Sequence, residues 1–218
     1  MTQTPLSGAA AVLIGLVALA AVAFQPTWMI VEHIDVMAHE GAHGIISSLS
    51  GRGVESIKIN PNGSGATRSA RGGRISSNVA IGVVGYVGPS AFGVGAAALI
   101  QAGYILSMFW VALVLLVVLL LAVRWSFAFV TVPLALILTF LIAKFAPMQT
   151  QVIAAYALAW LLLLAGVRSI IELGLIPRGD AENLRKATFI PRLIWSLLWL
   201  AGALAAVAFG GRMLVMPA

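Results

Sequence analysis

The chain has 218 residues, of which 61% are hydrophobic and only 9% are charged. A soluble domain carries about 25% charged residues, so this composition excludes an ordinary soluble protein and indicates an integral membrane protein. The chain has no cysteine, which excludes disulfides and thiolate metal ligands and leaves histidine and carboxylate for any zinc site. The net charge of +6 is better explained by basic cytoplasmic loops than by nucleic acid. We therefore expect contact with a lipid bilayer and no binding of nucleic acid.

Seven segments are long and apolar enough to cross a membrane, since a helical span needs about 20 mainly apolar residues. Several of their boundaries carry a proline or a charge, such as Pro26, Arg124 and Pro147. The sequence therefore predicts an all-α polytopic membrane protein with about seven transmembrane helices. The predicted spans are Leu6–Phe24, Thr27–Leu49, Asn78–Ile100, Tyr104–Val123, Ser126–Phe145, Gln149–Val167 and Pro191–Phe209.

The first predicted span has a second interpretation as a signal peptide. Ala21-Val22-Ala23 has the small-x-small form of a cleavage site. However, no Lys or Arg precedes Leu6, and the apolar stretch is longer than the core of a typical signal peptide. Both observations favour a retained helix, and either outcome leaves the downstream topology unchanged.

The distribution of basic residues predicts an orientation. Seven spans place the two ends of the chain on opposite sides and the loops 50–77, 124–125 and 168–190 on one side. Counting Arg192 with these loops, eleven of the thirteen Lys and Arg residues fall on that side, and only Lys144 and Arg212 remain for the other. Because basic residues accumulate in cytoplasmic loops, we expect that side, and with it the N-terminus, to face the cytoplasm.

A short segment after the second span differs in character from the rest of the chain. Val54, Ile57 and Ile59 are followed by Asn60-Pro61-Asn62-Gly63, which is typical of a turn. The pattern predicts a small β-hairpin over residues 54–69 on the cytoplasmic side.

The second predicted span contains His39-Glu40-Gly41-Ala42-His43, an H-E-x-x-H pattern. Residues four apart lie on one face of a helix, so both imidazoles can bind one metal ion. Glu40 points beside that face, where it can accept a proton from metal-bound water. Ionisable residues inside a membrane span are costly and indicate function. The alternative is a pair of structural histidines that hydrogen-bond to their neighbours.

A catalytic zinc ion usually has three protein ligands, so the two histidines need a third. Asp35 lies on their helical face, but four residues of helix rise about 6 Å, and a straight helix does not bring all three to one ion. Asp35 and Glu32 are instead expected to accept an imidazole N–H or to line a water path. Asp180, in the loop 174–190, is the stronger candidate, because the topology brings it to a similar depth. Glu172 is the fallback, and capping of a helix is the alternative role for Asp180.

Five segments carry a family resemblance in combination: Ala38–Gly44, Gly51–Glu55, Asn60–Gly65, Gly85–Pro89 and Gly179–Leu184. Together they resemble the M50B-like branch of the site-2-protease (M50) membrane metallopeptidases, which are mostly bacterial. The resemblance covers about residues 30–200. The chain departs from the N-P-D-G motif of site-2 proteases, because Asn62 stands in the place of the aspartate, and we reject Asn62 as a ligand.

The resemblance implies that His39 and His43 bind Zn²⁺, that Glu40 is the catalytic base, and that an aspartate before a late helix, here Asp180, is the third ligand. It also implies a metallopeptidase that cleaves membrane-protein substrates in a bacterial inner membrane. The length fits one membrane-embedded domain over residues 1–218, and the distribution of basic residues places its active site toward the cytoplasm. The alternative is a metal-binding but non-proteolytic membrane scaffold or transporter component. Polar residues are concentrated on one span instead of being distributed over several, which favours the peptidase.

Overall fold

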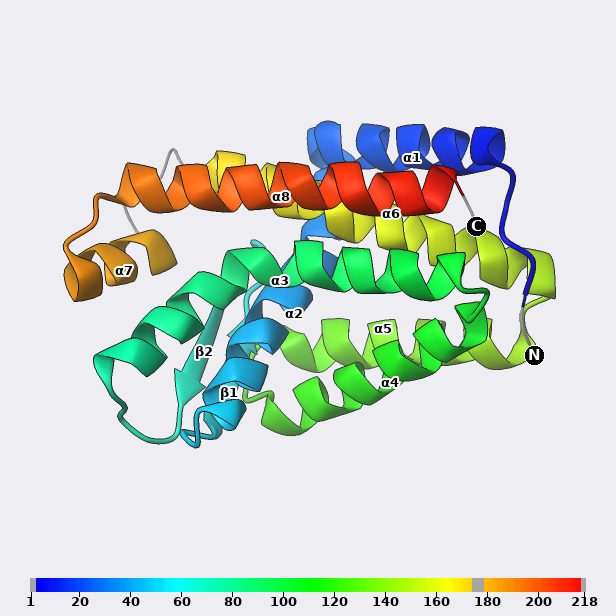
Figure 1. The fold of residues 1–218 in the computed structure, drawn as a ribbon. Coiled ribbons are helices and arrows are strands. Elements are labelled where there is room, and N and C mark those ends of the chain that lie inside the picture. Colours follow the sequence, from blue (N-terminus) through cyan, green and yellow to red (C-terminus); the bar gives the residue numbers. More distant parts are fainter. Residues whose placement is uncertain (1–2, 174–178, 217–218) are drawn as a thin grey trace.

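In the computed structural model, which describes residues 3–173 and 179–216, the chain is mostly helical (Figure 1). A two-stranded sheet interrupts the helices once, as predicted. In chain order the elements are α1 (Gly8–Ala23), α2 (Gln25–Leu49), β1 (Val54–Ile59), β2 (Gly65–Ser69), α3 (Ile75–Gln101), α4 (Ile105–Ala122), α5 (Ala128–Phe145), α6 (Met148–Leu173), α7 (Asp180–Thr188) and α8 (Arg192–Val215).

Within the described residues, five helices are long and apolar enough to cross a membrane: α3, α4, α5, α6 and α8. Helices α1 and α2 are long and apolar enough only when they are taken together, and their axes meet at a bend of 102°. They give a sixth candidate if they form one broken span. Seven separate spans are therefore not confirmed. Hydropathy detects the length of an apolar segment, but it does not detect a change of direction between two adjacent segments.

The bend between α1 and α2 has identifiable causes. Helix α2 begins with Gln25 and Pro26, and proline is favoured in the first turn of a helix, where its missing N–H costs nothing. The guanidinium of Arg168 on α6 donates to the carbonyl oxygens of Val22 and Ala23 at 3.1 Å and to Oε1 of Gln25 at 2.6 Å. These bonds satisfy the last carbonyls of α1 and hold the break in place.

Both ends of the chain lie at the same end of the helical bundle (Figure 1). The backbone N–H of Gln3 donates to the carbonyl oxygen of Gly103 at 2.9 Å, and Nε2 of Gln101 donates to the carbonyl oxygen of Met216 at 3.3 Å. The α3–α4 turn is therefore next to both termini. An even number of crossings returns a chain to the side of the membrane on which it began, so this arrangement agrees with an even number of spans.

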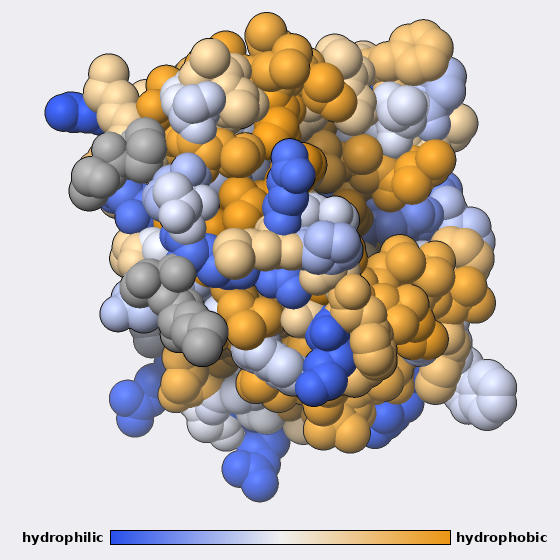
Figure 2. Space-filling model, turned by 90° about the vertical axis from the view of Figure 1, so that its right-hand side faces the viewer, coloured by the Kyte–Doolittle hydropathy of each residue, from blue (hydrophilic) through white to orange (hydrophobic). Residues whose placement is uncertain are grey.

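Helix α3 packs against α2, α6, α7 and α8, and small residues allow this close approach. A Cβ added to Gly88 would lie 2.5 Å from Cβ of Ala42 on α2, and one added to Gly93 would lie 2.8 Å from Cγ of Leu163 on α6. Glycines at helix interfaces let backbones come together in membrane proteins. The outer surface is largely apolar, and Figure 2 shows hydrophobic residues over most of the face that carries the termini.

The strands β1 and β2 form the antiparallel hairpin expected over residues 54–69. The outer edge of β1 is covered, since Ile57 pairs with Val123 and the N–H of Arg124 donates to the carbonyl oxygen of Ile57 at 3.0 Å. Ile57 and Ile59 are buried against this support. The hairpin is thus fixed to the α4–α5 turn by β1, whereas β2 lies on the side of β1 away from that turn.

The loop expected over 174–190 contains a helix. Residues 174–178 lie outside the described residues, but α7 occupies Asp180–Thr188. Its first turn carries acidic residues and its last turn carries Arg185 and Lys186, which is the charge order that the helix dipole favours. This polar helix lacks the hydropathy signal by which the longer helices were predicted.

Candidate metal centre

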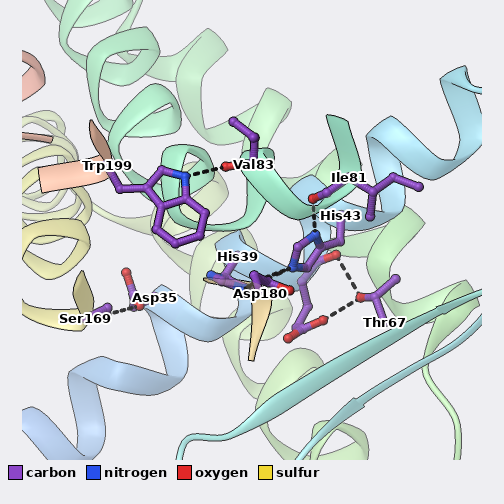
Figure 3. A network of polar contacts seen from close by, with 10 residues as sticks. Asp35, His39, His43, Thr67, Ile81, Val83, Ser169, Asp180 and Trp199 are labelled. Carbon is purple, nitrogen blue, oxygen red and sulfur yellow. Dashed lines mark hydrogen bonds and ion pairs between the residues drawn. The ribbon is translucent and has the colours of Figure 1, made fainter. Parts of the chain in front are cut away.

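His39 and His43 lie one turn apart on α2, and their imidazoles converge (Figure 3). The two Nε2 atoms are 3.0 Å apart. Nδ1 of His43 is 2.7 Å from the carbonyl oxygen of Ile81 on α3, so Nδ1 carries the proton and Nε2 is free to bind a metal. The H-E-x-x-H pattern therefore forms the arrangement that its spacing predicts.

Aromatic packing fixes the other ring. The ring of Tyr86 on α3 lies edge-on to His39 with 4.6 Å between the ring centroids, and Trp199 on α8 packs on Tyr86 at 4.7 Å. Nε1 of Trp199 donates to the carbonyl oxygen of Val83 at 3.0 Å. No pattern in the sequence predicts these roles for Tyr86 and Trp199, although Tyr86 belongs to one of the motifs that carry the family resemblance.

Asp180 reaches the same point from the opposite side of the site (Figure 3). Its Oδ2 lies 3.1 Å from Nε2 of His39 and 3.1 Å from Nε2 of His43. Asp180 is the first residue of α7, and the N-cap position belongs to Gly179, which has a φ of 84°. The side chain of Asp180 therefore points at the imidazoles and does not cap its own helix.

The environment of Asp180 keeps it ionised. Burial alone would raise the pKa of this carboxyl group, but in the metal-free protein, where the imidazoles can carry protons at Nε2, the hydrogen bonds and charges of His39 and His43 together hold the pKa well below its usual value. An ionised carboxylate is the form that ligates a metal.

These three side chains fit a zinc ion. Their ligand atoms are 3.0–3.1 Å apart, near the ~3.3 Å that separates ligand atoms around tetrahedral zinc with bonds of about 2.0–2.1 Å. Gly85 on α3 leaves the necessary space, because a Cβ there would lie 2.5 Å from Nε2 of His43 and 2.6 Å from Nε2 of His39. In the described part of the chain, His39, His43 and Asp180 form a group of three residues that can hold one metal ion.

Glu40 is buried beside this centre, with 3% of its surface exposed. Its carboxylate turns toward the hairpin, where the hydroxyl of Thr67 on β2 lies 2.5 Å from Oε2 of Glu40. Glu40 therefore adjoins the imidazoles without competing with Asp180 for the ligand position.

The sequence model of one family, described as Peptidase M50B-like, matches residues 12–210. This chain belongs to the Peptidase M50B-like family. Comparison with curated proteins and with solved structures gives no match. Membership supports a membrane peptidase, and the family resemblance inferred from the sequence motifs is confirmed.

The other candidate ligands of this M50B-like chain are engaged elsewhere. Glu172 accepts hydrogen bonds from Arg168 and from Nε1 of Trp28, and Asp35 accepts one from Ser169. Asn62, rejected as a ligand from the sequence, lies in the turn between the two strands. Among the described residues no hydrogen bond joins Asp35 or Glu32 to His39, so their expected role toward an imidazole stays a prediction.

A cavity of about 1280 Å³ opens onto the centre. Its walls come from α2, the hairpin, α3, α6 and α7, and its lining includes His39, His43, Glu40 and Asp180. Glu32 and Asp35 also line it, which agrees with their alternative role beside a path for water. An M50B-like peptidase needs such a space, because both water and a peptide must reach the ligands from outside the apolar bundle.

Proposed function

We propose that this M50B-like protein is an intramembrane zinc metallopeptidase in which residues 1–218 form one domain. The observation that carries the proposal is the convergence of His39, His43 and Asp180 within 3.1 Å of one another. Glu40 lies next to them, and the cavity gives access. Family membership supports the peptidase activity, and the geometry supports the metal and the role of each residue.

Zinc bound by the three ligands would lower the pKa of a coordinated water toward about 7 and polarise the peptide carbonyl. Glu40 accepts a proton from the attacking water, whose oxygen forms a bond to the carbonyl carbon of the substrate. Glu40 then donates that proton to the amide nitrogen as the carbon–nitrogen bond breaks. The products are a carboxylic acid and an amine, so all atoms of water and peptide are accounted for.

The substrates we propose are membrane proteins with a locally unwound segment, because a transmembrane helix hides its carbonyls in internal hydrogen bonds. The hairpin supports this choice. Its β1 edge is occupied by Val123 and Arg124, whereas no backbone hydrogen bond within the described residues joins the other edge of β2 to a further segment. An extended peptide can pair with such an edge, and β2 lines the cavity that leads to the centre.

We propose that the hairpin, α7 and the metal centre face the cytoplasm of a bacterial inner membrane. The described parts of the loops 50–77, 124–125 and 168–190 lie at this end of the bundle (Figure 1), in agreement with the distribution of Lys and Arg. If α1 and α2 form one span, both termini lie on the opposite side. This placement replaces the cytoplasmic N-terminus that seven spans predicted.

The orientation can be tested by labelling single cysteines, because the chain has none of its own. A cysteine at Gln3 and one at Asn62 should react with a membrane-impermeant reagent from opposite sides of the membrane. Labelling of both from one side would contradict the six-span arrangement.

The test of the function is Glu40→Gln. This substitution should leave zinc bound and lower peptide cleavage by about 10²–10⁴-fold, because it removes the proton acceptor but keeps the shape of the side chain. Cleavage of casein and of inner-membrane vesicle proteins by the detergent-purified enzyme, read by mass spectrometry, measures the effect. The matched control is Glu55→Gln on the hairpin, whose exposed carboxylate pairs with Arg68 and does not itself line the cavity.

Wild-type cleavage that depends on zinc and disappears in Glu40→Gln would establish the peptidase. Retained cleavage in Glu40→Gln would contradict the assignment of the base. A zinc-loaded wild type that cleaves neither preparation would favour the alternative of a metal-binding, non-proteolytic scaffold or transporter component.

A further inference from the structure

The strand β2 lies along α2, and three contacts define how the two elements are aligned. Ser47 on α2 has its hydroxyl 2.8 Å from that of Ser69, and Glu40 meets Thr67. Farther along, the turn glycine Gly63 faces Glu32, since a Cβ at Gly63 would lie 2.4 Å from the carboxyl carbon of Glu32. The hairpin therefore covers α2 over the segment that carries the proposed catalytic residues.

Thr67 contacts Glu40 at two atoms. Its hydroxyl oxygen is 2.5 Å from the carboxylate oxygen Oε2 and 3.1 Å from the backbone carbonyl oxygen of Glu40. In the described part of the chain, the Glu40 carboxylate has no other hydrogen-bond donor, and its second oxygen, Oε1, makes no hydrogen bond. The Thr67 hydroxyl thus fixes one carboxylate oxygen and leaves the other for a water molecule.

A second residue of the same strand provides room for the carboxylate. A Cβ at Gly65 would lie 2.3 Å from Oε1 of Glu40, so a larger residue there would displace the side chain. Gly65 and Thr67 are two residues apart and lie on the same face of β2. That face consequently gives Glu40 both a space and a hydrogen-bond donor.

The position of Thr67 is itself supported from behind. Thr67 pairs with Ile57 of β1. Ile57 is 2% exposed and its carbonyl oxygen accepts the N–H of Arg124. The donor therefore belongs to a strand pair that is anchored to the α4–α5 turn.

We propose that Thr67 is a positioning residue for the reaction, which holds the Glu40 carboxylate in the orientation needed to accept the proton of the attacking water. The inference rests on the proposed peptidase function. A hydrogen bond to a charged group is stronger than one between neutral groups, which suits it to hold a buried carboxylate. The competing explanation is that Thr67 only docks the hairpin onto α2.

Kinetics of three variants separate these explanations. Thr67→Val keeps the shape of the side chain but removes the hydroxyl, and it should lower kcat by about 10- to 100-fold with little change in KM, since a base displaced by ~1 Å loses this much rate. Thr67→Ser restores the hydroxyl and should recover most of kcat. Ser69→Ala loosens the same strand at its contact with Ser47 and should lower kcat much less than Thr67→Val.

A measurement on the metal-free protein tests the contact without relying on activity. Thr67→Val should lower the melting temperature of the wild type and have a smaller effect in a Glu40→Ala background, because the bond to the carboxylate is already lost there and only the contact with the backbone carbonyl remains. An equal shift in both backgrounds would overturn the contact. Wild-type kcat in Thr67→Val, or a loss in Thr67→Ser as large as in Thr67→Val, would overturn the positioning role.

The two failures are distinguishable. If wild-type protein cleaves no peptide, the proposed function is wrong, whereas the melting experiment still decides whether Thr67 holds Glu40. If wild-type protein cleaves and the Thr67 variants behave as docking mutants, only the positioning role is wrong.

Discussion

Helices α4 and α5 differ from helix α2 in the charged residues that they carry and in the side chains that they bury. In α4 and α5, Lys144 is the only charged residue, and most large apolar side chains, such as Leu121 and Ile137, are exposed to the surroundings. Helix α2 carries several ionisable residues and buries three of them: Asp35, Glu40 and His43. Polar groups in a membrane are costly, so their burial in one helix indicates one site where the cost is offset by function.

Helix α2 accommodates its ionisable residues because only one of its two faces is apolar. Val36 and Met37 pack against Ala128 and Val132 of α5 in an apolar cluster. The other face meets the small residues of α3, the polar strand β2 and the start of α7. Helices α4 and α5 therefore shield the centre from lipid on one side, whereas the residues that complete the centre come from partners far away in sequence.

The largest effect of a single substitution, a loss of zinc binding, is expected at Gly85. Gly85→Ala places a methyl group 2.5–2.6 Å from both Nε2 atoms of the histidine pair and should abolish zinc binding. Gly95→Ala is the matched control on the same helix, because nothing lies within 4 Å of a Cβ there. Zinc per chain, measured on purified protein after dialysis, checks the result. Equal zinc content in the two variants would show that α3 does not border the metal.

An intermediate effect is expected in the apolar packing. Leu163→Ala on α6 removes a fully buried side chain and should destabilise the protein by about 2–5 kcal/mol, through lost transfer energy and a cavity. Leu134→Ala on α5 removes a side chain that is 53% exposed and should change the stability by less than about 1 kcal/mol. Denaturant unfolding in detergent measures both. Similar losses would contradict the assignment of α5 to the outer layer.

The smallest effect concerns the ion pairs that Glu182 makes in the first turn of α7. Hydrogen bonding to Arg185 lowers the pKa of Glu182 below its ordinary value of 4.5, with further help from Lys186 and Arg192. The Glu182 carboxylate therefore stabilises the fold at a pH above its ordinary pKa. This contribution is lost as the pH falls through the lowered pKa that Glu182 has in the folded state. Glu182→Gln should lower the melting temperature of the metal-free protein at pH 7 and have no effect at strongly acidic pH. A pH-independent difference would mean that packing, not charge, is responsible.

Much of the site was predictable because it depends on local spacing. His39 and His43 need only the helical repeat to face one point, and the hairpin follows from Val54, Ile57 and Ile59 and a turn. Asp180 was chosen by depth and family resemblance, and the structure places it beside the imidazoles.

The remaining features depend on contacts across long stretches of sequence. The break at Gln25 is held by Arg168 from α6, so the number of spans did not follow from hydropathy. The contact of Thr67 with Glu40 depends on where β2 lies along α2, and no residue pattern specifies that alignment. Helix α7 enters the sequence analysis only through the alternative that Asp180 caps a helix, because its polar residues give no hydropathy signal; the acidic residues in its first turn and the basic ones in its last support that helix.

The metal centre is tested most simply by measuring the zinc content of purified wild-type protein beside Asp180→Ala and Glu172→Gln. We predict about one zinc ion per chain in the wild type, a clear loss in Asp180→Ala, and full binding in Glu172→Gln, since the Glu172 carboxylate pairs with Arg168. Zinc retained by Asp180→Ala and lost from Glu172→Gln would contradict the proposed ligand set. A wild type that binds no zinc after reconstitution would contradict the metal centre itself.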